Sequence, residues 1–319
     1  MSTAVETAAQ AELADQPRSP RHGFIRSVVF GQPACFIGIS VVIAFTLIAV
    51  FAPLLEPYSV TQQVGKVYQP PSSAHWLGTD DGGIDVFSEL IAGARVSMLV
   101  GFAGAAVAMF IGGLVGLISG FYGGKSDIVL MRITDYFLVI PDVPLMIVAA
   151  AIFGRSLQNI IIIIGIIYWT STARLIRAQV KSVRERVYVK RARALGAGNR
   201  RLMTNHVLPQ VVPLIIANTV LMIATAIFAE TYISFLGLGD PSTISWGKMI
   251  QNSLQGGAIF YKAWWAIIPP GAMVTIIILA STMVGTSIED ALNPRLRVGH
   301  LSVRRFRLRP LVGRPDSDY

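Results

Sequence analysis

The chain contains several apolar runs of about 20 residues, and this feature constrains its fold more than any other. A helix of roughly 20 residues crosses a hydrocarbon core about 30 Å thick. Lipid offers the backbone no hydrogen-bond partners, so even the five isoleucines of 160–164 are predicted to be helical. Only 14% of the residues are charged, against roughly 25% in soluble domains. The sequence therefore predicts an all-α, polytopic membrane protein with about six transmembrane helices.

The predicted spans cover approximately residues 34–55, 96–120, 128–153, 157–172, 211–236 and 264–288. Glycine and alanine are frequent in the second span, which allows close helix packing in lipid. Pro141 and Pro144 should kink or unwind the third span. We divide the chain into a disordered N-terminal tail (1–30), a first transmembrane helix with an extracytoplasmic loop (31–95), a core domain of five transmembrane helices (96–290) and a basic C-terminal tail (291–319).

Basic residues are concentrated in a few segments, and this pattern predicts the orientation. The segment 174–209 carries ten basic side chains and one acid, whereas the loop 56–95 carries two basic residues and five acids. An even number of spans places both termini on one side, and the positive-inside rule makes that side the cytoplasm. The net charge of +9 is thereby explained without nucleic acid. We expect a multi-pass protein of the bacterial inner membrane.

Other motifs are missing from the sequence, and this limits the possible functions. The single cysteine, Cys35, excludes a disulfide framework and a cysteine-based metal site. His75 and His206 are predicted on opposite sides of the membrane, so they cannot share a metal ion. No Gly-x-x-x-x-Gly-Lys-Ser/Thr string occurs. The chain is therefore not predicted to be an enzyme.

The basic segment between the fourth and fifth spans is predicted to form two short helices. Residues 188–195 are compatible with a helix, 196–199 break it, 200–207 resume it, and Leu208-Pro209 end it before the fifth span. Small residues at the turn would give a low tip that fits another protein's groove. A solvated loop that binds lipid headgroups is the alternative.

The string from Tyr188 to Pro209 resembles the EAA loop of binding-protein-dependent ABC importer permeases. Ala192, Gly196 and the Leu-Pro pair match that loop, while Lys190-Arg191 stand where it usually has Glu-Ala. In the family this loop is the coupling helix, which docks in a cleft of the cytoplasmic ATPase subunit. The coupling residues that the resemblance implies are Lys190, Arg191, Ala192, Arg193, Ala194, Leu195, Gly196, Ala197, Leu208 and Pro209.

Three further strings, His75–Asp80, Glu230–Gly239 and Asp290–Arg295, resemble C-type dipeptide/oligopeptide/nickel permeases in the same order. This implies the ABC type I importer permease fold and half of a translocation path for di- or oligopeptides, with nickel chelates left open. The implied partners are a homologous B-type permease, ATP-binding subunits that hold ATP and Mg²⁺, and an extracytoplasmic solute-binding protein. This chain itself would bind no cofactor. A gradient-driven secondary transporter or channel is the alternative.

Polar residues within the predicted spans are candidates for the translocation path. On the fifth span we single out Asn218, Met222, Thr225, Glu230 and Ser234. These residues either line the path or hold helices together through hydrogen bonds. Asp135, in the third span, is expected to pair locally with Arg132, three residues earlier.

Overall fold

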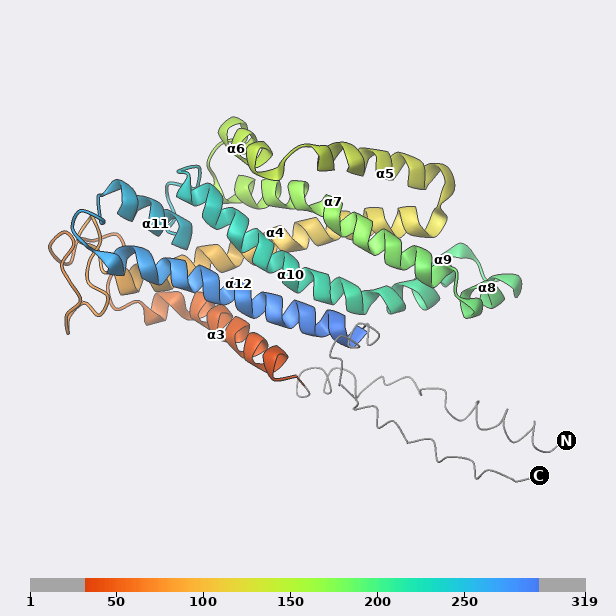
Figure 1. Cartoon of the computed structure of the whole chain (residues 1–319), viewed down its shortest axis with the longest axis horizontal. Coiled ribbons are helices and arrows are strands. Elements are labelled where there is room, and N and C mark those ends of the chain that lie inside the picture. The colour runs from red at the N-terminus through yellow and green to blue at the C-terminus, as the bar shows by residue number, and fades with distance from the viewer. Residues whose placement is uncertain (1–31, 293–319) are drawn as a thin grey trace, which may run out of the picture.

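The computed structural model describes residues 32–292, which form an elongated bundle of helices (Figure 1). The predicted tails, 1–30 and nearly all of 291–319, lie outside these residues. Five described helices are long and apolar enough to cross a membrane, and a bent pair supplies a sixth span. The prediction of an all-α protein with about six spans is confirmed. The helices are α3 (Pro33–Leu55), α4 (Val86–Tyr122), α5 (Gly124–Val139), α6 (Asp142–Phe153), α7 (Leu157–Arg184), α8 (Val187–Ala194), α9 (Asn199–Leu202), the π-helix η1 (Met203–Val207), α10 (Leu208–Phe235), α11 (Trp246–Gln255) and α12 (Trp264–Leu292).

Two helices extend beyond the spans predicted from hydropathy. Helix α4 begins at Val86, because the Asp85 side chain accepts a hydrogen bond from the backbone N–H of Ser88 and caps the helix. The predicted loop boundary at residue 95 was therefore wrong. Helix α7 continues to Arg184, so the predicted loop 174–209 begins as helix. Its last turns are held by apolar packing of buried Val180 and Val183.

The third span is broken in two, as its prolines predicted. Helices α5 and α6 meet at an angle of 87°. Pro141 lies at the break and, by restricting the residue before it, leaves Ile140 extended (φ −80°, ψ 125°). Pro144 is tolerated in the first turn of α6, where no backbone N–H is required. Pro141 therefore causes the interruption.

Helices α4 and α7 pack backbone to backbone through a row of glycines. Gly112, Gly116 and Gly120 lie four residues apart on α4 and face α7. A Cβ atom at Gly116 would lie 2.6 Å from the carbonyl oxygen of Ala173, and the other two glycines meet α7 carbonyls in the same way. This confirms the close packing predicted from the small residues of the second span.

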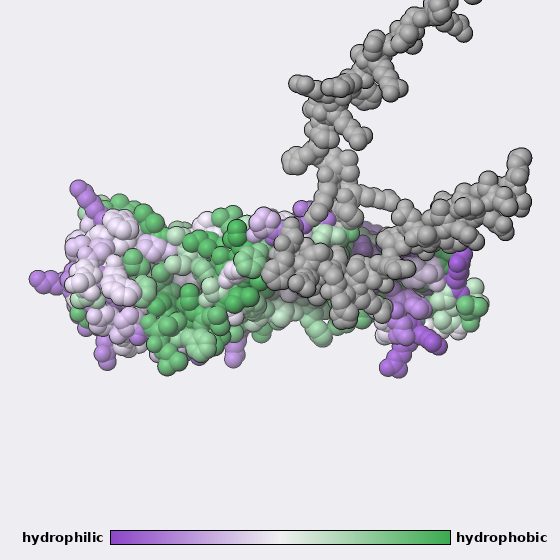
Figure 2. Space-filling model, turned by 90° about the horizontal axis from the view of Figure 1, so that it is seen from below, coloured by the Kyte–Doolittle hydropathy of each residue, from purple (hydrophilic) through white to green (hydrophobic). Residues whose placement is uncertain are grey.

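The two ends of the bundle differ in polarity. In Figure 1, the loop 56–85 and α11 lie at one end and α8 and α9 at the other, and the start of α3 and the end of α12 point toward the end with α8 and α9. The basic residues of α8 and α9 therefore lie at the end that the positive-inside rule assigns to the cytoplasm. Figure 2 shows the α3 side of the molecule, with apolar surface gathered between hydrophilic ends. This band is the surface that lipid covers.

Candidate functional site

A helical hairpin, residues 185–207, projects from the cytoplasmic end of the bundle, and we call it the coupling hairpin. Helix α8 is followed by a turn at 195–198, then by α9 and η1. The predicted helix–break–helix arrangement is confirmed. The predicted stop at Leu208-Pro209 was wrong, because these residues form the first turn of α10, directly after η1. The π-helical turn of η1 directly before it changes the hydrogen-bond pattern where Pro209 lacks a donor.

The inner side of the coupling hairpin is packed against the bundle. Val189, Leu202 and Val207 are fully buried, and they share one apolar cluster with Val180 and Val183 of α7. Each fully buried side chain of this size stabilises the packing by about 1.5–3 kcal/mol. Two predicted coupling residues, Ala192 and Ala197, pack against the same cluster. The hairpin is therefore fixed to α7.

The outer side of the coupling hairpin is open. Leu195 is 90% exposed at its tip, and Arg191, Arg193 and Ala194 are exposed beside it. Gly196 has φ +85°, and no atom lies within 4 Å of the position that a Cβ would occupy. Glycine is favoured there by the backbone conformation and not by crowding. The tip presents one apolar side chain surrounded by basic ones. This arrangement suits a groove on a partner protein that is apolar inside and acidic at its edge.

Glu185 is the single acid of segment 174–209 and is paired. Its carboxylate lies 2.9 Å from Lys190 Nζ and 3.3 Å from a guanidinium nitrogen of Arg184. The hydrogen bond from Lys190 lowers the pKa of Glu185 below its ordinary value. Glu185 and Lys190 are both exposed, so the ion pair between them adds little stability. It does neutralise the acid, which leaves the hairpin surface basic.

Charged side chains join α5 to α7 near the cytoplasmic end. Asp127 is buried and accepts hydrogen bonds from both Arg177 and Lys181. Farther along, Asp135 lies 2.6 Å from Arg174 of α7. The expected local pair with Arg132 was wrong, because α7 runs beside α5 and presents Arg174 at closer range.

Three of the predicted path residues on α10 are buried against other helices of this chain. Met222, Glu230 and Ser234 are buried, Glu230 with only 2% of its surface exposed. The Glu230 carboxylate accepts hydrogen bonds from Ser234 Oγ at 2.6 Å and Ser97 Oγ at 3.3 Å. These contacts agree with the alternative role, in which polar groups hold helices together.

Asn218 and Thr225, the other two predicted path residues, are half-buried. Asn218 donates a hydrogen bond to Thr172 Oγ1 at 3.1 Å and so links α10 to α7. Thr225 donates to the carbonyl of Leu221 in its own helix. The role of all five residues in translocation stays a prediction.

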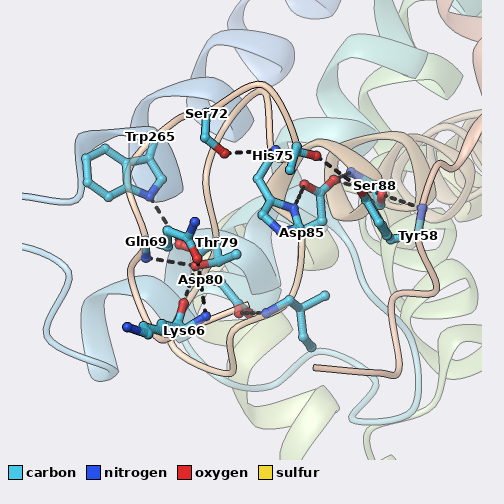
Figure 3. Close-up of polar contacts among 12 residues, drawn as sticks. Tyr58, Lys66, Gln69, Ser72, His75, Thr79, Asp80, Asp85, Ser88 and Trp265 are labelled. Atoms are coloured by element: carbon cyan, nitrogen blue, oxygen red, sulfur yellow. Dashed lines mark hydrogen bonds and ion pairs between the residues drawn. The ribbon is translucent and has the colours of Figure 1, made fainter. Parts of the chain in front are cut away.

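A buried polar cluster ties the extracytoplasmic loop to the start of α4 (Figure 3). His75 Nδ1 lies 2.9 Å from Asp85 Oδ1. Asp85 Oδ2 accepts hydrogen bonds from the backbone N–H and the hydroxyl of Ser88, at 2.9 and 2.8 Å, and Tyr58 N–H donates to the same hydroxyl. The string His75–Asp80, which resembles C-type permeases, begins with the histidine of this cluster. Sequence reasoning had recognised the string without finding its role.

The same loop is also joined to α12. Trp265 Nε1 donates to the carbonyl of Thr79 at 3.1 Å (Figure 3). Asp80 Oδ1 accepts the backbone N–H groups of Gly82 and Ile84. Burial nevertheless raises the pKa of Asp80 to about 6. Between residues 32 and 292, no group of three or more His, Cys, Asp or Glu side chains could hold a metal ion.

Comparison with known proteins identifies the family. Residues 112–298 match the family model described as "Binding-protein-dependent transport system inner membrane component". The chain belongs to this family. The matched residues run from the second half of α4 through the coupling hairpin to the end of α12. The chain is thus the multi-pass inner-membrane permease component of an ABC transporter and not its ATPase subunit, and that transporter includes a binding protein and ATPase subunits.

Curated relatives of this permease align over most of its length. The dipeptide transport system permease protein DppC of Alkalihalophilus pseudofirmus is 38% identical over 82% of this chain and 86% of the relative. The oligopeptide transport system permease protein OppC of Bacillus subtilis is 36% identical over 82% and 85%. The DppC protein of B. subtilis is 34% identical over 82% and 81%.

We expect Asp85→Ala to destabilise the permease by about 2–4 kcal/mol. The substitution removes a helix cap, worth about 1 kcal/mol, and leaves buried polar groups of His75 and Ser88 without their acceptor, at about 1–3 kcal/mol. Thermal unfolding of the purified subunit in detergent measures the effect. Asp81→Ala, in the same loop but without these contacts, is the control. Equal unfolding temperatures for the two variants would contradict the role given to the cluster.

Proposed function

We propose that this permease is the C-type subunit of an ABC importer for di- and oligopeptides. Relatives named dipeptide and oligopeptide transport system permease proteins, at 34–38% identity over about four-fifths of the chain, support this substrate class. A homologous B-type permease supplies the second half of the translocation path. An extracytoplasmic solute-binding protein delivers the peptide, and ATP with Mg²⁺ is bound by cytoplasmic partner subunits.

The coupling hairpin transmits the work of the ATPase subunits. The observation that carries this proposal is the contrast between the two sides of the hairpin. The inner side is fixed to α7 by fully buried valines and Leu202, while the outer side presents exposed Leu195 in a basic surround. A rigid base with a free, partly apolar tip suits a segment that docks in a partner's groove. Lys190 and Arg191 favour an acidic patch beside that groove.

Reconstitution of the complete transporter tests this function. Proteoliposomes would contain this chain, the partner permease, the ATPase subunits and the binding protein, and uptake of radiolabelled dipeptides and longer peptides would be measured. We expect uptake to require ATP and to stop when the ATPase subunits lack their nucleotide-loop lysine. Uptake by this chain without ATPase subunits, driven by a proton or sodium gradient, would instead establish a secondary transporter.

A further inference from the structure

The break between α5 and α6 places an acidic side chain deep in the membrane. Asp142 begins α6 and is exposed. Its Oδ2 accepts a hydrogen bond from Tyr168 Oη at 3.2 Å. Tyr168 follows the first residue of α7, Leu157, by eleven positions, or about 17 Å at 1.5 Å per residue. Because the hydrocarbon core is about 30 Å thick, Asp142 lies near its middle.

Asp142 lies in the first turn of α6, and the backbone N–H of Val143 donates a hydrogen bond to its Oδ1 at 3.0 Å. Among the described residues, no Lys, Arg or His side chain forms an ion pair with it. Helix α5 ends at Val139, just before the break. The last carbonyl groups of a helix have no partners within it, and they carry the negative end of its dipole. The negative end of α5 and the positive start of α6 therefore offset each other beside Asp142, and its carboxylate, which has no cationic partner among the described residues, favours a cation.

Polar side chains continue from Asp142 toward the cytoplasm on one side of α7. Tyr168, Ser171 and Arg174 follow one another at intervals of three residues. Ser171 is exposed, and the Arg174–Asp135 ion pair has about half of each side chain exposed. We call this row the polar strip; it consists of Asp135, Asp142, Tyr168, Ser171 and Arg174.

The polar strip differs from the face of the bundle that lipid covers. Along α3 the large exposed side chains are apolar, Ile43 and Leu47 among them, and the apolar surface of Figure 2 lies on that side. A charged side chain facing lipid at the centre of a helix costs about 2.5–3.5 kcal/mol. Irregular backbone, as at Ile140-Pro141, is tolerated at this depth only inside protein or beside water. The polar strip therefore faces away from lipid.

We propose that the polar strip lines the water-filled route of the transported solute, and that Asp142 binds the ammonium group of that solute. Arg174 is already paired with Asp135, so the Asp142 carboxylate is the charge on the strip that is left to attract a cation. An ammonium group is the cationic end of a zwitterion such as a peptide. The inference rests on the proposed function and adds to it the residues that the solute meets.

Thiol labelling tests the inference in the complete transporter. The chain has one cysteine, Cys35, which is buried, so Cys35→Ala gives this chain a background without thiols, and the Cys35→Ala transporter without further changes measures labelling of the partner subunits. In this background, Ser171→Cys on the polar strip is the reporter. The two controls are Thr172→Cys, at a buried position beside Ser171, and Ile43→Cys, at a position on α3 that is 53% exposed. A charged, membrane-impermeant methanethiosulfonate reports contact with water. Labelling is followed in proteoliposomes, with reagent on both sides, at rest and in the ATP–vanadate state.

We expect Ser171→Cys to react at least tenfold faster than both control variants in one of the two states. Ile140→Cys, at the break, is a second reporter if Ser171→Cys does not assemble. A rate equal to that of Ile43→Cys in both states would overturn the inference, since the strip would then be covered by lipid or by the partner permease. Peptide uptake by the same vesicles separates the two proposals: uptake without labelling refutes only the polar strip, and uptake without ATPase subunits refutes the importer.

The charge of Asp142 is tested with the same reporter. In Ser171→Cys, the ratio of the labelling rates of a cationic and an anionic reagent reports the local potential. We expect Asp142→Asn to lower this ratio at least threefold, because removing one negative charge affects the two reagents in opposite directions. An unchanged ratio would show that Asp142 does not act on solutes in the route. Asp81→Asn, in the extracytoplasmic loop, is the control that leaves the ratio unchanged.

Discussion

Gly116→Leu is expected to abolish accumulation of the folded permease, whereas Gly113→Leu is expected to leave most of it intact. Even a Cβ atom at Gly116 would lie 2.6 Å from the backbone oxygen of Ala173, which cannot move aside as a flexible side chain could. At Gly113, in the same helix, the nearest atom would be Ile176 Cδ1 at 3.8 Å. Overpacking a tight core costs about 1–3 kcal/mol, and separating two helix backbones costs more.

Replacing the same two glycines by alanine gives a finer measure of the contact between α4 and α7. Gly116→Ala and Gly113→Ala gain about 1 kcal/mol of helix propensity alike, so their difference isolates the clash with α7. Yield and unfolding temperature of the detergent-purified subunit, followed by size-exclusion chromatography, are the readouts. The role assigned to the glycine row fails if Gly116→Leu folds with the stability of the unaltered protein.

Deletion of Gly196-Ala197 is expected to reduce peptide uptake more than tenfold while this subunit stays folded. The deletion shortens the tip of the coupling hairpin. Gly196 has no neighbours within the chain, and Ala197 adds only one small side chain to the apolar cluster, so the partner contact is affected more than folding. Retention of the ATPase subunits during affinity purification and ATP-driven uptake in proteoliposomes measure the outcome. Uptake at the unaltered rate would exclude the tip from coupling.

Two valine substitutions separate the effect of the backbone conformation at the tip from the effect of added side-chain volume. Gly196 and Gly198 are both sterically open, but only Gly196 has a positive φ. A residue with a Cβ pays about 1–2 kcal/mol in the left-handed region, and valine is branched as well. Gly196→Val should therefore weaken ATPase retention and uptake, and Gly198→Val should change both much less.

The sequence predicted the features that follow from hydropathy and from proline. The apolar runs located six spans, Pro141 located the break in the third, and the glycine-containing turn at 196–199 located the hairpin. Hydropathy could not locate the ends of helices, because it measures which residues suit lipid and not where hydrogen bonding stops. Asp85 caps α4 well outside the apolar run, and α7 continues past it toward the cytoplasm. Helix α11 was missed because it is short and largely polar.

Predictions of site residues depended on knowing which side of a helix is covered. Glu230 attracted attention as an acid within a span, yet the fold buries it between two serines. Asp142 was not singled out, although an acid directly after a proline within an apolar run is a signal for a broken helix that lines water. No sequence pattern indicated that Arg174, in a basic segment, would pair with Asp135 across two helices.

The continuity of η1 with α10 has a mechanical consequence. From Asn199 to Phe235 the backbone is one helical rod of 37 residues, about 55 Å long. The rod includes the π-helix η1 and Pro213 and runs from the tip of the coupling hairpin to the loop that follows Phe235, where Asp240 holds the first N–H of α7. A displacement of the tip is therefore expected to move the outer end of α10 and the start of α7 as well.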